Sequence, residues 1–429
     1  MNDPSCRRRC GIATRTLLAA MLLIAPTAAG ASQATSEELR QLTRRYQALT
    51  NEGGPTDPAS LAAEFVLLLQ DLKSVERGTL PLAERIDHDV LNWLLDVGII
   101  EYVEPELSKY EVALIRHTGA RQDPERLHQL GLDEVARIRA AMEALVQRYD
   151  SSAKLEEFLD AAREDSRLYA GSRDELVELA RRAAATIRRN LGTLFDEVPT
   201  TPFQIVTPGE RRSPGYMGWY QGPGRGPEAR GFVVLNPDPR QVPLFVLDAL
   251  IVHEAIPGHH FQMAWAAESV DVPEWRRDIL LTVFVEGWGL YAESLGAELG
   301  VYRHPMSEFG RLNLEMWRAI RLVVDTGLHA FDWTPQQATE FFLENTALPR
   351  AQVRVEVDRY ARNPGQAVAY KIGEQHLLAI RARAEGALGV AFDVRGFHRA
   401  VLEHGPMPMR TLEEVIDIWV AEQQTAPDP

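Results

Sequence analysis

The sequence predicts a mainly α-helical protein with a small β-sheet or hairpin preceding one of its later helices. Three observations support this fold class. Residues 36–195 place Leu, Ile, Val and Ala at helical spacing, with charged residues on the opposite side. Residues 200–243 are dense in Gly, Pro and aromatic residues and contain short apolar runs typical of strands. Helical spacing returns afterwards, for example in residues 317–331 and 410–420.

The first 31 residues differ in character from the rest of the chain. Arginines at positions 7 to 9 precede an apolar stretch at 17–25, and the segment ends in Ala29-Gly30-Ala31. This order is typical of a secretory signal peptide, and the apolar stretch is too short to span a membrane. A retained membrane anchor is the alternative. We expect cleavage, export to the periplasm or the medium, and no membrane attachment afterwards.

Composition sets further bounds on the 429-residue chain. A hydrophobic content of 45% is enough for a sizeable core, and the net charge of −15 argues against nucleic acid or anionic lipid as a partner. The two cysteines, Cys6 and Cys10, both lie in the signal segment, so the exported body is expected to have no disulfides. We expect an N-terminal helical region at 32–199 and a catalytic region at 200–429, packed together as one body.

Individual elements can be predicted within this plan. Helices are expected at Asp123–Tyr149 and Ser172–Phe195, and helical spacing also covers Leu61–Asp96. The second of these opens on a Ser-x-x-Glu sequence, which is the spacing of a capping box. Thr201–Thr207 and Gly231–Asn236 are the best strand candidates.

The glycine-rich residues 215–226 allow two interpretations. They could form a mobile cover over a cleft, or a hairpin and its turn with no part in binding. The sequence does not distinguish between these alternatives.

A cluster of histidines carries the strongest chemical signal. Residues 253–260 read His-Glu-Ala-Ile-Pro-Gly-His-His. Neutral imidazoles bound to Zn²⁺, with an adjacent glutamate that accepts a proton from water, are the components of a zinc hydrolase. In the usual motif, however, the second histidine follows the first by four residues, and here that position is Pro257. Polar residues around a buried helix kink are the alternative.

Pro257 and Gly258 offer a physical explanation for the altered spacing. On a straight helix, His253 and His259 point roughly 120° apart and could not bind one ion. Pro257 removes a helical hydrogen bond, so the helix must bulge or break, and Gly258 allows the irregular backbone that follows. We therefore expect His253 and His259 to be the metal ligands, with His260 as the substitute for His259.

Glu286 is the candidate for the third ligand. It follows His259 by enough residues for one helix to end and a second to pack against it, and Gly287 and Gly289 would allow a close approach. Glu293 lies on the same helical face and is placed to fix the orientation of a ligand histidine. Ordinary surface charges on an amphipathic helix are the alternative.

Four motifs together resemble a known family. These are the segment at 253–260, Glu-Gly-Trp-Gly-Leu-Tyr-Ala-Glu at 286–293, Val-Val-Asp-Thr-Gly-Leu-His at 323–329, and Asn-Pro-Gly-Gln-Ala-Val-Ala-Tyr-Lys-Ile-Gly at 363–373. The combination, spread over about residues 35–425, resembles the bacterial family DUF885. That family in turn resembles helical zinc carboxypeptidases and oligopeptidases, which end their metal motif in Gly-His and share the Glu-x₆-Glu spacing.

The resemblance implies roles for further residues. In helical zinc peptidases a tyrosine from a C-terminal helix donates a hydrogen bond to the oxyanion, which indicates Tyr370 here. The strand before the metal helix often binds extended substrate, which indicates Phe232 and Val234. The helical spacing separately places Arg321 and His329 on one face, as candidates for binding a substrate carboxylate and for the active site, respectively. A structural ion-pair ladder that ties helices together is the alternative.

We therefore expect zinc-dependent peptide hydrolysis with one Zn²⁺ held by His253, His259 and Glu286. Glu254 is expected to be the general base, assisted by Tyr370 and His329. Two alternatives stay open, namely a metallo-amidase or esterase that does not act on peptides, and a metal-stabilised envelope protein that binds without turnover.

Overall fold

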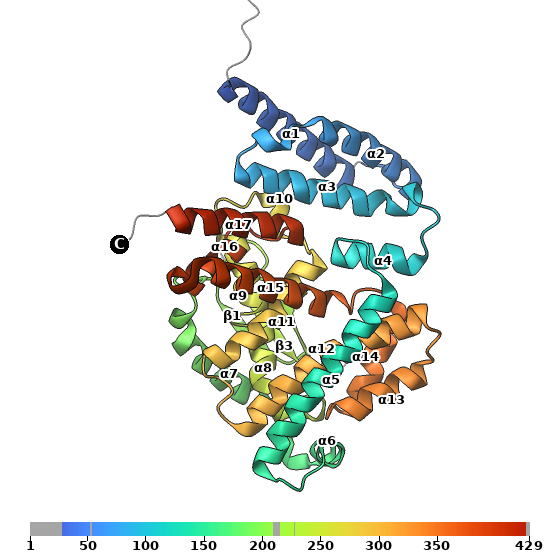
Figure 1. Cartoon of the computed structure of the whole chain (residues 1–429), viewed down its shortest axis with the longest axis vertical. Helices are drawn as coiled ribbons and strands as arrows, with labels where there is room; N and C mark the ends of the chain where they lie inside the picture. Colours follow the sequence, from blue (N-terminus) through green and yellow to red (C-terminus); the bar gives the residue numbers. More distant parts are fainter. Residues whose placement is uncertain (1–27, 52–53, 209–214, 227, 426–429) are drawn as a thin grey trace, which may run out of the picture.

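Seventeen α-helices and one three-stranded sheet make up the described part of this computed structural model, which covers residues 28–51, 54–208, 215–226 and 228–425 (Figure 1). The predicted class, mainly α with a small sheet ahead of the helix that carries the histidine motif, is confirmed. The predicted signal peptide lies almost entirely outside the described residues. Among the described helices, none is long and apolar enough to cross a membrane.

A three-helix bundle forms the N-terminal end of the described chain and is drawn in blue in Figure 1. It consists of α1 (Ala28–Thr50), α2 (Pro58–Ser74) and α3 (Leu82–Val103). The bundle has a hydrophobic core of its own, to which Phe65, Leu68, Leu72, Leu91 and Leu95 contribute. The helical spacing at 61–96 thus corresponds to two helices, which are separated by a turn.

The next helices include the two that were predicted individually. They are α4 (Lys109–Thr118), α5 (Pro124–Tyr149), α6 (Leu155–Glu164) and α7 (Arg173–Asn190). Asp123 caps α5, and the Ser172 hydroxyl accepts from the Glu175 N–H at the start of α7. The Glu175 carboxylate accepts from the N–H of Gly171, one residue before the N-cap that a capping box would use.

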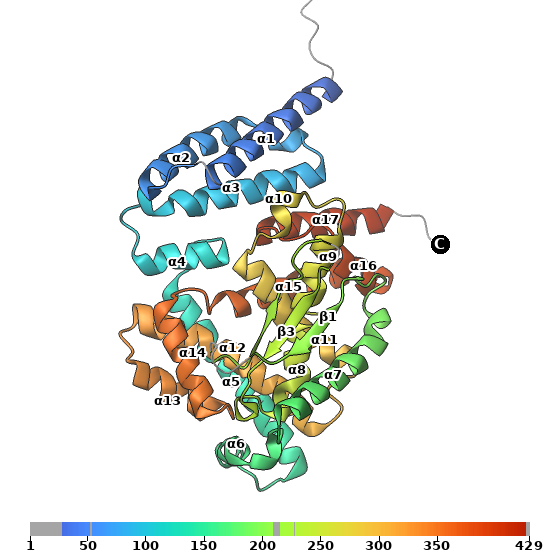
Figure 2. The same cartoon turned by 180° about the vertical axis from the view of Figure 1, so that it is seen from behind.

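The sheet follows α7 and lies beside the central helices (Figure 2). Its strands are β1 (Phe203–Val206), β2 (Gly218–Gln221) and β3 (Gly231–Leu235), in the order β1-β3-β2. β3 is central, parallel to β1 and antiparallel to β2. Both predicted strands are present, and β2 with β3 forms the hairpin that was one of the two interpretations of residues 215–226.

The remaining helices surround the site described below. α8 (Leu244–Glu254), α9 (His259–Glu268), α11 (Thr282–Glu298) and α12 (Pro305–Ala330) are central, and α15 (Ala369–Leu388) packs along α11. The others are α10 (Glu274–Arg277), α13 (Pro335–Asn345), α14 (Arg350–Arg362), α16 (Val394–Leu402) and α17 (Met409–Thr425). One large hydrophobic core runs from Ile86 to Ile416 and includes side chains from both sides of residue 200.

Candidate metal centre

The helix that carries the histidine motif breaks at the proline. α8 ends at Glu254 and α9 begins at His259, with a tight turn between them. Gly258 has to be glycine, because a Cβ there would lie 1.9 Å from the carbonyl oxygen of His253. The Gly258 N–H donates to the carbonyl of Val252, which holds the turn against the end of α8 (2.9 Å). The turn thus places His253 at the end of one helix and His259 at the start of the next.

Trp288 fixes this turn to the neighbouring helix. Its indole N–H, on α11, donates to the carbonyl oxygen of Pro257 at 2.8 Å, and the ring is fully buried. A carbonyl released by the helix break is thereby satisfied by the helix that carries Glu286. The histidine turn and the glutamate helix are consequently held in register.

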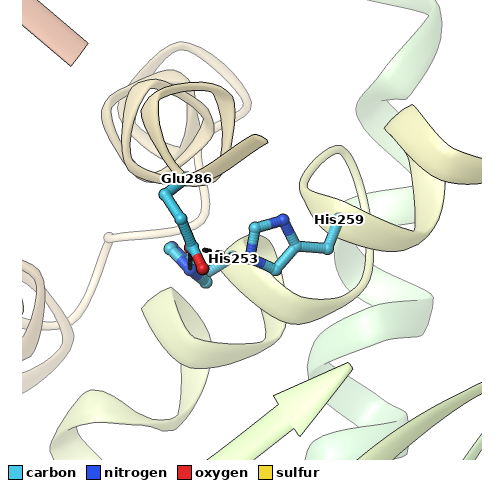
Figure 3. A group of neighbouring side chains, drawn as sticks. All are labelled: His253, His259 and Glu286. Carbon is cyan, nitrogen blue, oxygen red and sulfur yellow. Dashed lines mark ion pairs between the residues drawn. The ribbon is translucent and has the colours of Figure 1, made fainter. Parts of the chain in front are cut away.

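His253, His259 and Glu286 converge on a common point (Figure 3). Each can offer one ligand atom, and the three atoms lie within 4.8 Å of one another. Glu286 Oε2 is 3.2 Å from His259 Nε2 and 3.7 Å from His253 Nε2. Two ligands on a tetrahedral zinc with bonds of about 2.0–2.2 Å are roughly 3.3 Å apart, so this spacing suits a single ion.

Gly289 allows α11 to lie close to His253 of α8 and His259 of α9. A Cβ at this position would lie 2.8 Å from Cε1 of His253 and 2.9 Å from Cε1 of His259, inside van der Waals contact. Gly287, on the opposite side of α11, faces Gly373 of α15, where a Cβ would lie 2.6 Å from the Gly373 Cα. The two glycines therefore serve two different helix contacts.

Glu293 lies behind the cluster and binds two partners. Its Oε1 is 2.8 Å from Nδ1 of His253 and 3.0 Å from the guanidinium of Arg318, and all three side chains are buried. A carboxylate at Nδ1 leaves Nε2 as the ligand atom and orients the ring. Arg318 in turn holds the carboxylate in place.

The electrostatics of the cluster favour positive charge at its centre. Burial opposes ionisation of Glu286, but the imidazoles of His259 and His253 outweigh it and hold the pKa of that carboxyl well below its usual range. Burial also opposes a charge on His253, yet the carboxylates of Glu286 and Glu293 raise its pKa to about 9. Such an environment suits a divalent cation.

The cluster lies in a cleft of about 770 Å³. Glu254 and Tyr370 line this cleft together with the three candidate ligands. β2 forms one wall through Gly218, Trp219 and Tyr220.

The chain matches the profile of a family described as bacterial proteins of unknown function, DUF885, over residues 107–416. The chain belongs to this family. The match takes in every helix from α4 to α16 and thus the whole candidate metal-ligand cluster. No curated protein matches the chain.

Two solved structures show the same fold as this DUF885 member. One, described as a "putative lipoprotein" from Colwellia psychrerythraea, has a TM-score of 0.70 and 28% sequence identity, covering 92% of this chain and 71% of that one. The other is described in the same words, and as of unknown function, from Shewanella oneidensis. It has a TM-score of 0.71 and 15% identity, covering 91% of this chain and 100% of that one.

His260 points away from the ligand cluster of the DUF885 chain. Its Nδ1 is 3.0 Å from the Tyr220 hydroxyl and its Nε2 is 3.0 Å from the carbonyl oxygen of Thr201. Burial lowers the pKa of this imidazole to about 4, so it stays neutral. Both ring nitrogens are engaged in tying α9 to the sheet, which leaves His259 as the second candidate ligand.

Tyr370 lies across the cleft from α8. Its ring is nearly parallel to that of His253, with centroids 6.4 Å apart, and the guanidinium carbon of Arg321 lies 4.1 Å from the ring centroid. Burial and the carboxylate of Glu286 raise the pKa of Tyr370 to about 12, so its hydroxyl keeps its proton in neutral solution. It can therefore act as a hydrogen-bond donor.

The prediction for His329 needs correction. It lies outside the set of residues that line the cleft, its Nε2 is 3.0 Å from the carbonyl oxygen of Tyr360, and its ring stacks on Tyr110. The cause is the length of α12, since His329 is two turns beyond Arg321 and has passed the end of the cleft. Its contacts are those of a residue that ties helices together.

The prediction for Phe232 and Val234 also needs correction. Both lie on β3, which pairs with β1 and β2 and so has no open edge. Neither lines the cleft. The edge that faces the cleft belongs to β2 instead.

Two features of the cleft could not be predicted from the sequence. One is that β2 provides an open edge, since residues 215–226 were interpreted as a cover or a hairpin. The other is Glu356, which is buried and binds both Arg321 (3.4 Å) and Arg359 (2.8 Å). The spacing of Glu356 from Arg359 on one helix was the available signal, but nothing in the sequence shows that α14 reaches α12.

Proposed function

We propose that this DUF885 protein is an exported zinc-dependent peptidase. The observation that carries the proposal is the meeting of His253, His259 and Glu286 at one point inside a cleft. Two imidazoles and one carboxylate are the ligands of a catalytic zinc site, which keeps a further position for water or substrate. A structural zinc site would have four protein ligands, and the described residues bring three together.

Zinc fits the donor atoms of this site. Both histidines can present Nε2 to an ion, and the contact with Glu293 orients the ring of His253. When bound, the ion would polarise a carbonyl group and make water more acidic. The protein's own side chains would then do the rest of the chemistry.

Glu254 is the proposed general base. It follows His253 directly, ends α8, and lines the cleft with only 7% of its surface exposed. A carboxylate in this position can take a proton from the attacking water and pass it to the departing amine. A site that only stored metal would have no need of this group.

Tyr370 is the proposed donor to the developing oxyanion. It is protonated in neutral solution, lines the same cleft, and its ring is held by Arg321. A fixed donor that is already oriented stabilises the negative charge that forms on the carbonyl oxygen of the scissile bond.

Export is supported from two directions. The segment at 1–31 has the order of a signal peptide. The similar structures from Colwellia and Shewanella are each described as a "putative lipoprotein". We propose that the protein acts outside the cytoplasm.

The test is the Glu254→Gln variant, which keeps the size of the side chain but cannot accept a proton. We expect hydrolysis of a mixed peptide pool to fall by about 10²–10⁴-fold, with zinc content unchanged. Glu344→Gln, at an exposed position on α13, is the control and should keep full activity. Undiminished hydrolysis by the Glu254 variant would rule out the proposed mechanism, and activity on esters but not peptides would favour the esterase alternative.

A further inference from the structure

A second cavity of about 590 Å³ lies next to the cleft. The two cavities share four lining residues, Tyr220, Met263, Leu280 and Val285, and we consider them together as one groove. Ala266, Ile279, Phe284 and Leu402 contribute an apolar part to the lining of the second cavity. Charged residues also line it, among them Arg225, which forms exposed ion pairs with Glu274 and Asp278.

The opposite end of the groove carries an excess of positive charge. Arg321 and Arg359 both bind the single carboxylate of Glu356, and all three line the first cavity. Arg318 is neutralised by Glu293, and Glu254 and Glu286 would be neutralised by a divalent cation. Among the described residues, Nη1 of Arg321 is a buried donor without a hydrogen-bond partner. One further carboxylate, from a ligand, would neutralise the excess positive charge of Arg321 and Arg359.

β2 runs along the groove from the cationic end to the apolar end. At its start, the ring of Tyr216 lies 5.8 Å from the guanidinium of Arg359. Just after its end, a Cβ on Gly222 would lie 3.8 Å from the sulfur of Met263, which lines the second cavity. The strand therefore gives the groove a direction.

The free edge of β2 offers main-chain hydrogen bonds to the groove. The N–H of Asn236 donates to the carbonyl of Met217 at 2.9 Å, so this pair is hydrogen-bonded. Because such pairs alternate along an antiparallel ladder, Trp219 and Val234 form the next one. Gly218 and Tyr220 must then direct their N–H and C=O groups away from β3, and both residues line the cleft.

We propose that the groove binds a peptide antiparallel to β2, with its free C-terminal carboxylate at Arg321 and Arg359. Its apolar residues on the N-terminal side of the cleaved bond would occupy the second cavity. An antiparallel strand on this edge has its C-terminus at the cationic end, so the charges and the strand direction agree. This inference rests on the proposed peptidase function and specifies it as removal of residues from the C-terminus. Hydrolysis adds the oxygen of water to the acyl carbon and a proton to the amine of the released C-terminal piece.

The test uses two peptides of the same apolar sequence, one with a free C-terminal carboxylate and one with a C-terminal amide. The zinc-loaded wild-type protein should cleave the free acid with a kcat/KM at least roughly 30-fold higher, because the amide leaves a buried guanidinium without its partner. Mass spectrometry should place the cut close to the C-terminus.

The Arg359→Gln variant tests the proposed contact between the peptide carboxylate and Arg359. It should raise KM for the free acid and lower the ratio of acid to amide cleavage below that of the wild type. Arg354→Gln is the matched control, because Arg354 is exposed on the same helix and lies outside the lining of the cleft. The acid-to-amide ratio in the control should equal that of the wild type.

The outcomes separate this inference from the proposed function. Equal cleavage of acid and amide by the wild type, or cuts at internal bonds only, would overturn C-terminal action and leave the peptidase function standing. An unchanged acid-to-amide ratio in folded Arg359→Gln would overturn the assignment of the cationic end. If the zinc-loaded wild type cleaves neither peptide, the proposed function fails and this inference fails with it.

Discussion

Gly289 determines how closely the metal ligands approach α11. The absence of a side chain leaves room for Cε1 of both His253 and His259 against the helix backbone. Any larger residue would push the imidazoles away from Glu286, which lies one turn earlier on the same helix. Positions of the ligands and packing of the helices are therefore set by the same residue.

Gly289→Ala should separate metal binding from folding. The added methyl overlaps both rings, so we expect zinc affinity to fall at least about 10-fold, with a cost in stability of about 1–3 kcal/mol from overpacking. Titration with a competing zinc chelator measures the affinity, and thermal unfolding measures the stability.

Gly386→Ala is the control for this substitution. Gly386 is also helical, on α15, and a Cβ there would have no neighbour within 4 Å. It should leave zinc binding unchanged and gain about 0.5–1 kcal/mol from helix propensity. Equal zinc affinity in the two variants would contradict the role given to Gly289.

Glu293 is the second residue whose removal has a specific expected effect. Glu293→Gln takes the charge away from both His253 and Arg318, so the imidazole is less well oriented and the buried guanidinium loses its partner. We expect zinc affinity to fall about 10–100-fold. Glu298→Gln, on an exposed part of the same helix, should bind zinc as the wild type does, and isothermal calorimetry compares the two.

The two candidate histidine ligands could be predicted because their signals are local. His253, Pro257, Gly258 and His259 lie within seven residues, so steric rules for proline and glycine were sufficient. The contact from Arg318 to Glu293 could not be predicted, because it depends on how α12 crosses α11. His329 was misplaced for the same reason, since its helical face was clear but its position along the cleft was not.

At the scale of elements, the break between α8 and α9 depends on a neighbour. Pro257 lies in the turn between α8 and α9, and Trp288 donates the hydrogen bond to its carbonyl oxygen. The turn therefore depends on its contact with α11, and we expect it to change conformation when that contact is removed.

Trp288→Phe tests this dependence. The ring is largely kept but the N–H is lost, which leaves a buried carbonyl unsatisfied at a cost of about 1–3 kcal/mol. We expect lower stability in urea and, because the turn carries His259, weaker zinc binding. Trp419→Phe on α17 is the comparison and should not affect zinc. A Trp288 variant with wild-type zinc affinity would show that the turn holds itself.

Strands were easier to predict than their order. Apolar runs indicated β1 and β3, but pairing on both sides of β3 arises only when residues 218–221 fold back on it. That pairing moves the open edge from β3 to β2 and explains why Phe232 and Val234 were assigned to substrate in error. Helices such as α5 and α7 were predicted well because their apolar faces repeat over many turns.

On the scale of the whole molecule, the candidate site joins three helices that belong to one large core. α8, α9 and α11 each contribute one ligand, and their apolar side chains belong to the same hydrophobic cluster. An ion at this point would link them, so metal binding and folding stability should be coupled.

Zinc should accordingly raise the melting temperature. At about 100 times its Kd, a ligand specific for the folded state adds about 2.7 kcal/mol, which corresponds to a shift of a few degrees. Differential scanning calorimetry of protein treated with a chelator, before and after addition of zinc, measures the shift. Glu286→Ala should lose most of it, and an equal shift in that variant would place the ion elsewhere.

The shortness of β2 restricts what can reach the catalytic groups. The strand has four residues, and of these only Gly218 and Tyr220 can offer outward main-chain groups. A bound peptide would therefore make main-chain hydrogen bonds over a very short stretch. So few hydrogen bonds cannot offset the cost of unfolding an extended segment of a folded protein. We therefore expect the proposed peptidase to act on short, unfolded oligopeptides and to leave folded proteins intact.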